Sequence, residues 1–291
     1  GLAGPDAGLE GDGPYLDKSS LVQAVCCSAT PTDFTDWGGG AFRGESAAGG
    51  DSQDARAALL KKLSPIAYAS ADAPPFLVFH GKADNTVPFS QGEKFVAALK
   101  AAGAKDVTFL TYEDAGHGVF SQHADETMPA MAAFFARTLG GAPQEAGRDA
   151  QGAPETSDTP DTTQAADAPR PRDREPSWLM DPVEGPNLHY KTFDSATAGQ
   201  PVSYLLYLPP DYDADLDARY PVVYWLHGIG GSQQGVPAMA TRLTEAIEAG
   251  KTPPMIVVYV NGMVRSGYVD SADGKYPVET VTIKELIPHI D

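Results

Sequence analysis

Apolar runs of strand length alternate with helical patterns along the first 140 residues. Three short runs of apolar and β-branched residues are typical of buried strands: Leu21–Ser28, Phe76–His80 and Val107–Tyr112. Two longer segments have apolar residues at helical spacing and end beside a glycine that favours a helix C-terminus: Ser90–Ala102 and Asp125–Leu139. Alternation of strands and helices predicts a parallel sheet covered by helices.

The last hundred residues show a similar order. Strands are predicted at Val202–Leu208, Pro221–His227 and Met255–Val260, and a helix at Pro237–Ala249 separates the last two. A second helix, amphipathic in pattern, is predicted at Val278–Ile290. This half is therefore also expected to be α/β, with a mostly parallel sheet and flanking helices.

The segment between the two halves has a different composition. Residues 141–185 contain seven prolines, ten acidic residues, four arginines and a single aromatic residue, Trp178. Such a segment buries too little apolar surface to offset the entropy of ordering it, so a disordered linker is predicted. The expected organisation is a first α/β domain at 1–140, the linker at 141–185 and a second α/β domain at 186–291.

Composition narrows the classes of partner and cofactor. The chain has 291 residues, 42% of them hydrophobic, and a formal net charge of −18. This acidity argues against nucleic acid or an anionic membrane surface as a partner, since both attract positive patches. Two adjacent cysteines and no H-E-x-x-H or C-x-x-C pattern argue against a disulfide framework and a zinc site, so no cofactor or metal is expected.

One pair of residues indicates acid–base chemistry. Asp84 follows the predicted strand Phe76–His80, and His117 lies between two glycines after the predicted strand Val107–Tyr112. Loops that follow parallel strands meet at one edge of the sheet, where α/β proteins place their sites. We expect the Asp84 carboxylate within roughly 3–4 Å of the His117 imidazole, holding the tautomer in which Nε2 is a base.

A glycine-rich turn marks the second half. His227, Gly228, Ile229, Gly230 and Gly231 follow a predicted buried strand directly. A turn of this kind lets backbone N–H groups approach a substrate oxygen, as an oxyanion hole requires, although a plain tight turn is the alternative interpretation.

Both halves resemble α/β-hydrolase esterases. Residues 15–139 resemble the C-terminal half of an acetylxylan or feruloyl esterase of the hormone-sensitive-lipase kind, on the motifs SPI (64–66), PPF (74–76), HGKADNTVP (80–88) and DAGHG (114–118). Residues 186–291 resemble the N-terminal half of an esterase-D-like or feruloyl esterase, on YLLYLPPDY (204–212), HGIGG (227–231) and KELIP (284–288). The resemblance implies Asp84 as triad acid, His117 as triad base and residues 227–231 as the oxyanion loop.

The expected serine nucleophile is not found in these residues. No G-x-S-x-G elbow precedes Leu21, and Ser46, in the segment GESAAGG, follows a glycine-rich loop where no strand-to-helix elbow is expected. The chain is therefore interpreted as a fragment of a tandem serine esterase, inactive as given. We also expect the edge strands Leu21–Ser28 and Pro221–His227 to pair in one sheet.

The resemblance implies an acylated plant polysaccharide or a small ester as substrate, and a secreted or periplasmic location. Two alternatives stay open. One is a serine peptidase, because prolyl-oligopeptidase-type peptidases have a similar C-terminal part. The other is a non-catalytic binding module built on a degenerate hydrolase fold, which the missing serine would explain.

Overall fold

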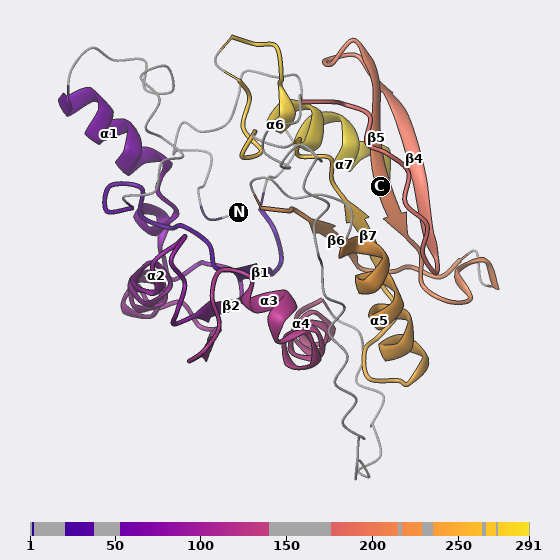
Figure 1. Cartoon of the computed structure of the whole chain (residues 1–291), viewed down its shortest axis with the longest axis horizontal. Helices are drawn as coiled ribbons and strands as arrows, with labels where there is room; N and C mark the ends of the chain where they lie inside the picture. Colours follow the sequence, from indigo (N-terminus) through magenta and orange to yellow (C-terminus); the bar gives the residue numbers. More distant parts are fainter. Residues whose placement is uncertain are drawn as a thin grey trace, which may run out of the picture. The chain divides into compact units, whose positions relative to one another are not determined.

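Two sheets flanked by helices make up the computed structural model of the chain (Figure 1). The structure describes residues 2, 21–37, 53–139, 176–214, 217–228, 235–263, 266–271 and 273–290. These residues fall into two units, whose boundary lies after Ala142. The expected α/β class is confirmed for both units.

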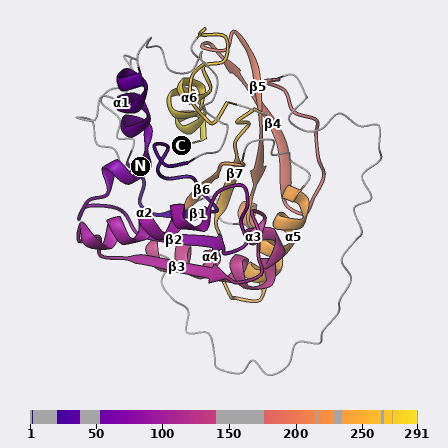
Figure 2. The ribbon, with the colours of Figure 1, turned by 60° about the vertical axis from the view of Figure 1, so that its left-hand side comes forward.

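The first sheet is parallel throughout, with strand order β1-β2-β3 (Figure 2). Its strands are β1 (Val25–Ser28), β2 (Phe76–Gly81) and β3 (Val107–Tyr112). Every residue of the central strand β2 is buried, whereas the edge strands β1 and β3 are mostly half-buried. All three strands were predicted from their apolar runs, and so was the parallel pairing.

Helices cover both faces of this sheet. Successive side chains of a strand point to opposite faces, so the contacts of β2 show which helix lies on each face. Phe76 and Val78 of β2 pack with Phe95 of helix α2 (Phe89–Ala101). Phe79 points the other way, with its ring 5.7 Å from that of Phe120. Figure 1 accordingly shows α2 on one side of the sheet and α3 and α4 on the other.

The helices of the first unit agree with the sequence pattern where that pattern is strong. Phe120 lies in the short helix α3 (Val119–Gln122), which α4 (Ala124–Thr138) follows. Helices α2 and α4 were predicted, and Gly103 after α2 has the positive φ of +90° expected at a helix C-terminus. Helix α1 (Gln53–Leu63) was not predicted, because it has no buried residue and only a weak apolar stripe.

The second sheet has strand order β4-β5-β7-β6. Its strands are β4 (Leu188–Ser195), β5 (Gln200–Tyr207), β6 (Val222–Trp225) and β7 (Ile256–Tyr259). The pairs β4–β5 and β5–β7 are antiparallel, and only β6–β7 is parallel. This sheet is therefore mixed, in contrast to the mostly parallel one expected. Strand β4 was missed because only two of its eight residues are buried, which leaves no apolar run to detect.

Helices flank the second sheet as well. Helix α5 (Val236–Glu248) lies against β5, where the Tyr207 hydroxyl is 3.0 Å from Thr244 Oγ1. The other helical stretch consists of α6 (Val278–Val281), a π-helical turn and α7 (Ile287–Ile290). Both helices were predicted, but the π-turn was not. It ends two residues before Pro288, whose missing N–H and bulky ring disfavour regular α-helical bonding.

Trp178 moves the expected boundary of the second unit. Its side chain is 4% exposed and belongs to the apolar core of that unit. Its carbonyl oxygen accepts hydrogen bonds from the Ser203 amide, at 2.9 Å, and from Asn261 Nδ2, at 3.0 Å. Residues 176–185 therefore belong to the second unit, whereas the linker was predicted to extend to residue 185. Residues 140–175 lie outside the described residues.

The predicted pairing of the two edge strands is also wrong. Strand β1 is an edge of the first sheet and β6 is an edge of the second, so the two strands belong to different sheets. The apolar character of an edge strand predicts that something covers it, but does not say which segment does.

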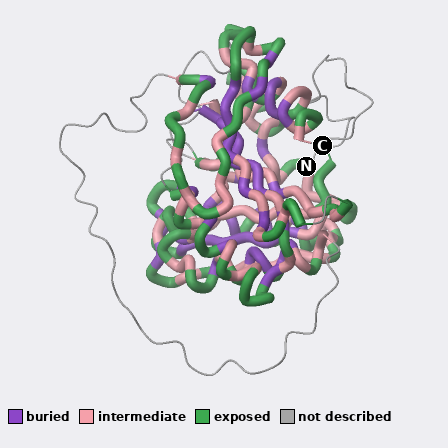
Figure 3. Tube along the Cα trace, turned by 90° about the vertical axis from the view of Figure 1, so that its right-hand side faces the viewer, coloured by how far each residue is buried: buried purple, intermediate pink, exposed green. Residues whose placement is uncertain are grey.

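Burial follows the strands in both units, as Figure 3 shows. The side chains with almost no exposed surface include Phe79 in the first sheet and Leu205, Tyr207 and Val258 in the second. Among the helices that the structure describes, none is long and apolar enough to span a bilayer.

Candidate active site

The loop after β2 buries the carboxylate of Asp84. Its side chain has no exposed surface, and Oδ1 accepts the backbone N–H groups of Thr86, at 2.8 Å, and Val87, at 2.9 Å. A buried carboxylate is costly unless hydrogen bonds replace its water, and two amide donors do so here. The loop is thereby folded around the acid.

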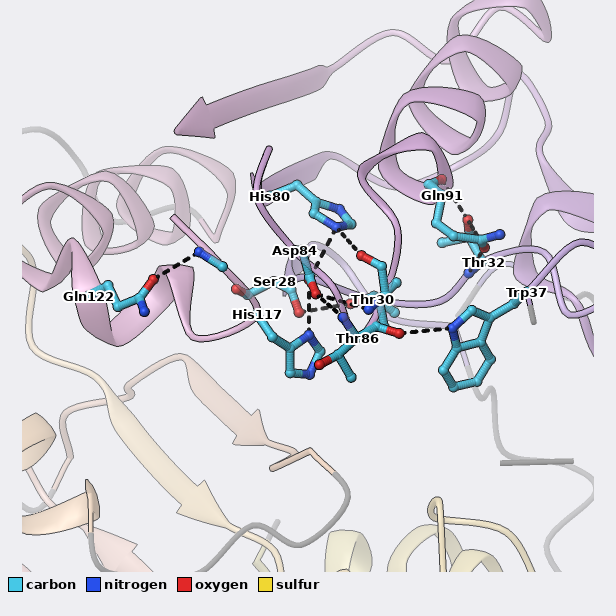
Figure 4. Close-up of polar contacts among 12 residues, drawn as sticks. Ser28, Thr30, Thr32, Trp37, His80, Asp84, Thr86, Gln91, His117 and Gln122 are labelled. Carbon is cyan, nitrogen blue, oxygen red and sulfur yellow. Dashed lines mark hydrogen bonds and ion pairs between the residues drawn. The ribbon is translucent and has the colours of Figure 1, made fainter. Parts of the chain in front are cut away.

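His117 supplies the other half of the pair. Its Nδ1 lies 3.0 Å from Asp84 Oδ2, and its side chain is 48% exposed (Figure 4). A proton on Nδ1, donated to the carboxylate, leaves Nε2 with a lone pair that can accept a proton. The predicted contact within 3–4 Å is confirmed, while the catalytic roles of Asp84 and His117 stay predictions.

The two loops meet because β2 and β3 are parallel neighbours in register, with Gly81 opposite Tyr112. Beyond that point the Lys82 amide donates to the Tyr112 carbonyl at 2.8 Å, and the Ala83 amide donates to the Ala115 carbonyl at 3.0 Å. A Cβ atom on Gly81 would lie 2.1 Å from the Ala115 oxygen. The close approach of the loops therefore requires a glycine at position 81.

Residues 82–88, which connect β2 to α2 and carry Asp84, are called the acid loop below. Two further residues contact this loop and were not singled out from the sequence. The indole N–H of Trp37 donates to the Thr86 carbonyl at 3.2 Å. The buried imidazole of His80 has Nε2 3.0 Å from the Val87 carbonyl oxygen and 3.5 Å from Asp84 Oδ2. The sequence signal for His80 was its position at the end of an otherwise apolar strand.

The segment that carries Trp37 is fixed to helix α2 by a buried amide. Gln91, 1% exposed, accepts the backbone N–H groups of Thr32 and Asp33 at 3.0 and 2.8 Å. The Thr32 hydroxyl in turn donates to the backbone carbonyl of Gln91 at 2.8 Å (Figure 4). Trp37 thus approaches the acid loop from a segment with its own anchor.

The two cysteines do not supply an activated nucleophile. Cys26 and Cys27 both lie in β1, and loss of hydration there raises the pKa of Cys26, and that of Cys27 to about 11. A thiol becomes a strong nucleophile only as thiolate, which a raised pKa makes scarce at neutral pH. This agrees with the expectation that both thiols are packing residues.

In the second unit the structure describes only the start of the predicted oxyanion loop. The His227 amide donates to the Tyr268 hydroxyl oxygen at 2.7 Å, and His227 Nδ1 lies 2.9 Å from the Gly228 carbonyl. The Tyr268 ring covers Gly262, where a Cβ atom would lie 2.2 Å from the ring. Burial raises the pKa of Tyr268, so its hydroxyl stays protonated.

This geometry bears on the predicted loop in a limited way. Because Tyr268 engages the amide of His227, that N–H is not available to a substrate oxygen. Ile229, Gly230 and Gly231 lie outside the described residues, so the role of the loop stays a prediction. Ser46 also lies outside them.

The described residues contain no cluster that could hold a metal ion. In those ranges no three His, Cys, Asp or Glu side chains converge as metal ligands would. Within the same ranges, the hydrogen bond found at the His117 ring is the one to Asp84. The arrangement can hold an oriented histidine base, and no bound metal is required for that chemistry.

Two family models match the chain, one in each unit. Residues 17–142 match the prolyl oligopeptidase family, and residues 195–291 match a family described as putative esterase. The chain thus resembles α/β-hydrolase esterases, and the resemblance extends to both units.

Curated relatives match short stretches. The esterase LipQ of Mycobacterium tuberculosis is 46% identical over 59 residues, which are 20% of this chain and 14% of LipQ. An endo-1,4-beta-xylanase/feruloyl esterase of Xylanibacter ruminicola is 33% identical over 114 residues, 36% of this chain and 16% of that protein. The chain therefore spans about one sixth or less of the length of these relatives.

Two solved structures are similar to part of the chain. A truncated carbohydrate esterase from gut microbiota is 27% identical, covers 44% of this chain and 47% of its own, and has a TM-score of 0.37. A bifunctional GH43-CE protein of Bacteroides eggerthii is 32% identical, covers 45% of this chain and 19% of its own, and has a TM-score of 0.34.

Proposed function

We propose that the first unit carries the acid and the base of a serine hydrolase that cleaves carboxylic esters. The observation that carries this proposal is the 3.0 Å contact between His117 Nδ1 and the buried Asp84 Oδ2. It orients the imidazole and leaves Nε2 on the more exposed side of the pair. The esterase relatives support an ester rather than another acyl compound.

The proposed reaction has two acyl-transfer steps. His117 Nε2 takes the proton of a serine hydroxyl while the serine oxygen bonds to the ester carbonyl carbon, and the resulting imidazolium is stabilised by Asp84. The imidazolium then protonates the leaving alkoxide as the C–O bond breaks. Water, deprotonated by the same nitrogen, then bonds to the acyl carbon. The imidazolium returns the proton to the serine oxygen as the acyl–serine bond breaks, which releases the carboxylic acid and restores the serine.

Backbone amides are proposed to stabilise the oxyanion of each tetrahedral intermediate. In the second unit we assign this role to residues 228–231, which follow β6 after two intervening residues. The second unit would then be the start of a second hydrolase domain, and the first unit the end of another. The serine nucleophile of each domain is proposed to lie outside these 291 residues.

Acetyl or feruloyl esters of plant polysaccharide are the proposed substrates, and the proposed location is outside the cell or in the periplasm. The substrate is supported by the similarity to a xylanase/feruloyl esterase and to carbohydrate esterases. A serine peptidase is the second candidate, favoured by the match of residues 17–142 to the prolyl oligopeptidase family.

The test compares the chain as given with the chain extended by its adjoining coding sequence in both directions. Each is assayed on p-nitrophenyl acetate, methyl ferulate and a proline p-nitroanilide, and labelled with a fluorophosphonate that reacts with activated serines. We expect ester cleavage and serine labelling in the extended protein, and neither in the chain as given. Loss of a triad member leaves only about 10³–10⁴-fold acceleration over water.

The variants Asp84→Asn and His117→Gln decide whether the pair is catalytic. Both should lower kcat of the extended protein by several orders of magnitude. An active extended protein that keeps its rate in both variants would contradict the proposal. An extended protein that is neither active nor labelled would favour the non-catalytic binding module, and cleavage of the anilide alone would favour the peptidase.

A further inference from the structure

A buried histidine that the proposed reaction does not use lies behind the acid. His80 is the fifth residue of β2, has no exposed surface, and contacts Phe89 of α2 edge-to-face with ring centroids 5.6 Å apart. Its ring is held between the sheet and α2, so its orientation is fixed. The residue belongs to the same strand end from which the acid loop departs.

The surroundings of the ring determine where its proton lies. His80 Nδ1 is buried and has no hydrogen-bond partner among the described residues. It faces Gly92, on which a Cβ atom would come within 2.6 Å of this nitrogen. A proton on Nδ1 would be a buried donor without an acceptor, and an imidazolium would bury a charge as well. In the neutral ring the proton therefore lies on Nε2, which has acceptors, and not on Nδ1.

That proton faces two acceptors of the acid loop. Nε2 lies 3.0 Å from the Val87 carbonyl oxygen and 3.5 Å from Asp84 Oδ2. Figure 4 shows His80 and Asp84 facing each other. The Val87 amide, in turn, donates to the other carboxylate oxygen, Oδ1, at 2.9 Å. His80, Val87 and Asp84 thus contact one another in a ring. The imidazole binds the backbone of Val87, and the same residue's amide binds the Asp84 carboxylate.

We propose that His80 is a positioning residue for the acid, whose Nε2–H keeps Asp84 Oδ2 directed at His117 Nδ1. The hydrogen bond from His80 Nε2 to the Val87 carbonyl fixes the backbone of the acid loop. The partial positive charge of the same N–H also attracts Asp84 Oδ2, and so favours the position in which Oδ2 contacts His117. The importance of this effect for catalysis rests on the proposed function, but the effect on His117 does not. It is a property of this chain alone.

The experiment is nitrogen-15 NMR of the imidazoles in the full chain, because the shifts of Nδ1 and Nε2 report the tautomer of each ring. In the unmodified protein we expect His80 as the Nε2–H form and His117 as the Nδ1–H form. Replacement His80→Leu removes the donor at similar size, and should lower the ratio of Nδ1–H to Nε2–H forms of His117 by about tenfold. Replacement His80→Gln restores an N–H near the position of Nε2 and should restore most of the ratio.

A matched control separates positioning from lost stability. Phe79 precedes His80 in β2 and packs on the opposite face, 5.7 Å from Phe120. The variant Phe79→Leu weakens the same strand without touching the acid loop, so the His117 tautomer ratio should stay unchanged.

Several outcomes would overturn the proposal. An unchanged His117 ratio in His80→Leu would do so, and so would a failure of Gln to restore it, or an equal change in Phe79→Leu. If His80→Leu does not fold, the unmodified protein still decides, because a protonated Nδ1 on His80 excludes the proposed bond. None of these measurements needs turnover, so failure here and failure of the esterase proposal are distinguishable.

Discussion

The replacement Asp84→Asn separates the two tasks of the acid. The amide oxygen of Asn can take the place of Oδ1 and accept the N–H groups of Thr86 and Val87. The amide nitrogen then faces His117 Nδ1 in place of Oδ2. Because an amide N–H is a donor, it favours a His117 ring without a proton on Nδ1, which moves the proton to Nε2. The loop is retained while the tautomer is reversed.

The expected loss of stability depends on which backbone N–H groups lose their hydrogen-bond acceptor. In Asp84→Ala both amides lose theirs, but Thr86 is exposed and water can replace one bond, whereas Val87 is 2% exposed. Loss of one buried, charge-assisted hydrogen bond costs about 2–3 kcal/mol. In Asp84→Asn the bond survives with a neutral acceptor, so we expect about 1 kcal/mol or less.

Hydrogen–deuterium exchange of the full chain measures these stabilities with an internal control. Peptides that cover β2 report the first unit, and peptides that cover β5 report the second, where neither variant should have an effect. Nitrogen-15 shifts of His117 report the tautomer in the same samples. In an active, extended protein the reversed tautomer should lower kcat by about 10⁴-fold, as expected for a Ser-His-Asp triad.

The reasoning would be refuted by either of two results. If Asp84→Asn destabilises β2 as much as Asp84→Ala does, the Oδ1 bonds are not what holds the loop. If His117 keeps its proton on Nδ1 in Asp84→Asn, the carboxylate does not set the tautomer, and the assignment of Asp84 as the orienting acid is wrong.

Three further predictions concern residues outside the acid–base pair. Trp178→Ala should destabilise the second unit by about 3–5 kcal/mol, since it empties a buried aromatic site, and faster exchange in β5 but not in β2 would show it. Tyr268→Phe removes the acceptor of the His227 amide, so exchange of that amide should rise about tenfold; an unchanged rate would contradict the 2.7 Å bond. Cys27, with its pKa raised to about 11, should react with iodoacetamide at pH 8 roughly 100-fold more slowly than an exposed cysteine, and a comparable rate would mean that the thiol is not desolvated.

The sequence predicted those strands that form a continuous apolar run. Strand β2 is buried at all six positions and was found within one residue of its observed end. Strand β4, an edge strand with alternating exposure, gave no comparable signal. The mixed pairing of the second sheet was also missed, because strand direction depends on how connections run in space rather than on the apolar pattern of each strand.

Trp178 shows a related limit. A window dominated by proline and charge predicts disorder, yet a single aromatic ring with two backbone contacts ties its neighbours to a core. Composition averages over such a segment, whereas burial of one large side chain is a local event whose partners, Ser203 and Asn261, are far along the chain.

The candidate site was predictable in its principal contact and not in its support. Two residues that follow adjacent parallel strands are brought to one edge of the sheet by topology, and so Asp84 and His117 could be paired from their positions alone. The contacts around the pair come instead from the Val87 amide and the His80 imidazole, which lie in one strand–loop segment, and from the Trp37 indole in a segment far along the chain.

The division of exposure within the pair agrees with the chemistry proposed for it. The Asp84 side chain is fully buried and has its charge satisfied by amides, so it has little freedom to turn away from the histidine. The His117 side chain is 48% exposed and lies between two glycines, so its Nε2 side is open to a reacting group. Repeated proton transfer requires a rigid acid and an accessible base. The base gains and loses a proton in every catalytic cycle and must return to the same tautomer each time. If the Asp–His contact were purely structural, the half-exposed His117 ring would add little to the stability of the fold. The amides that bind the Asp84 carboxylate would then only hold the acid loop.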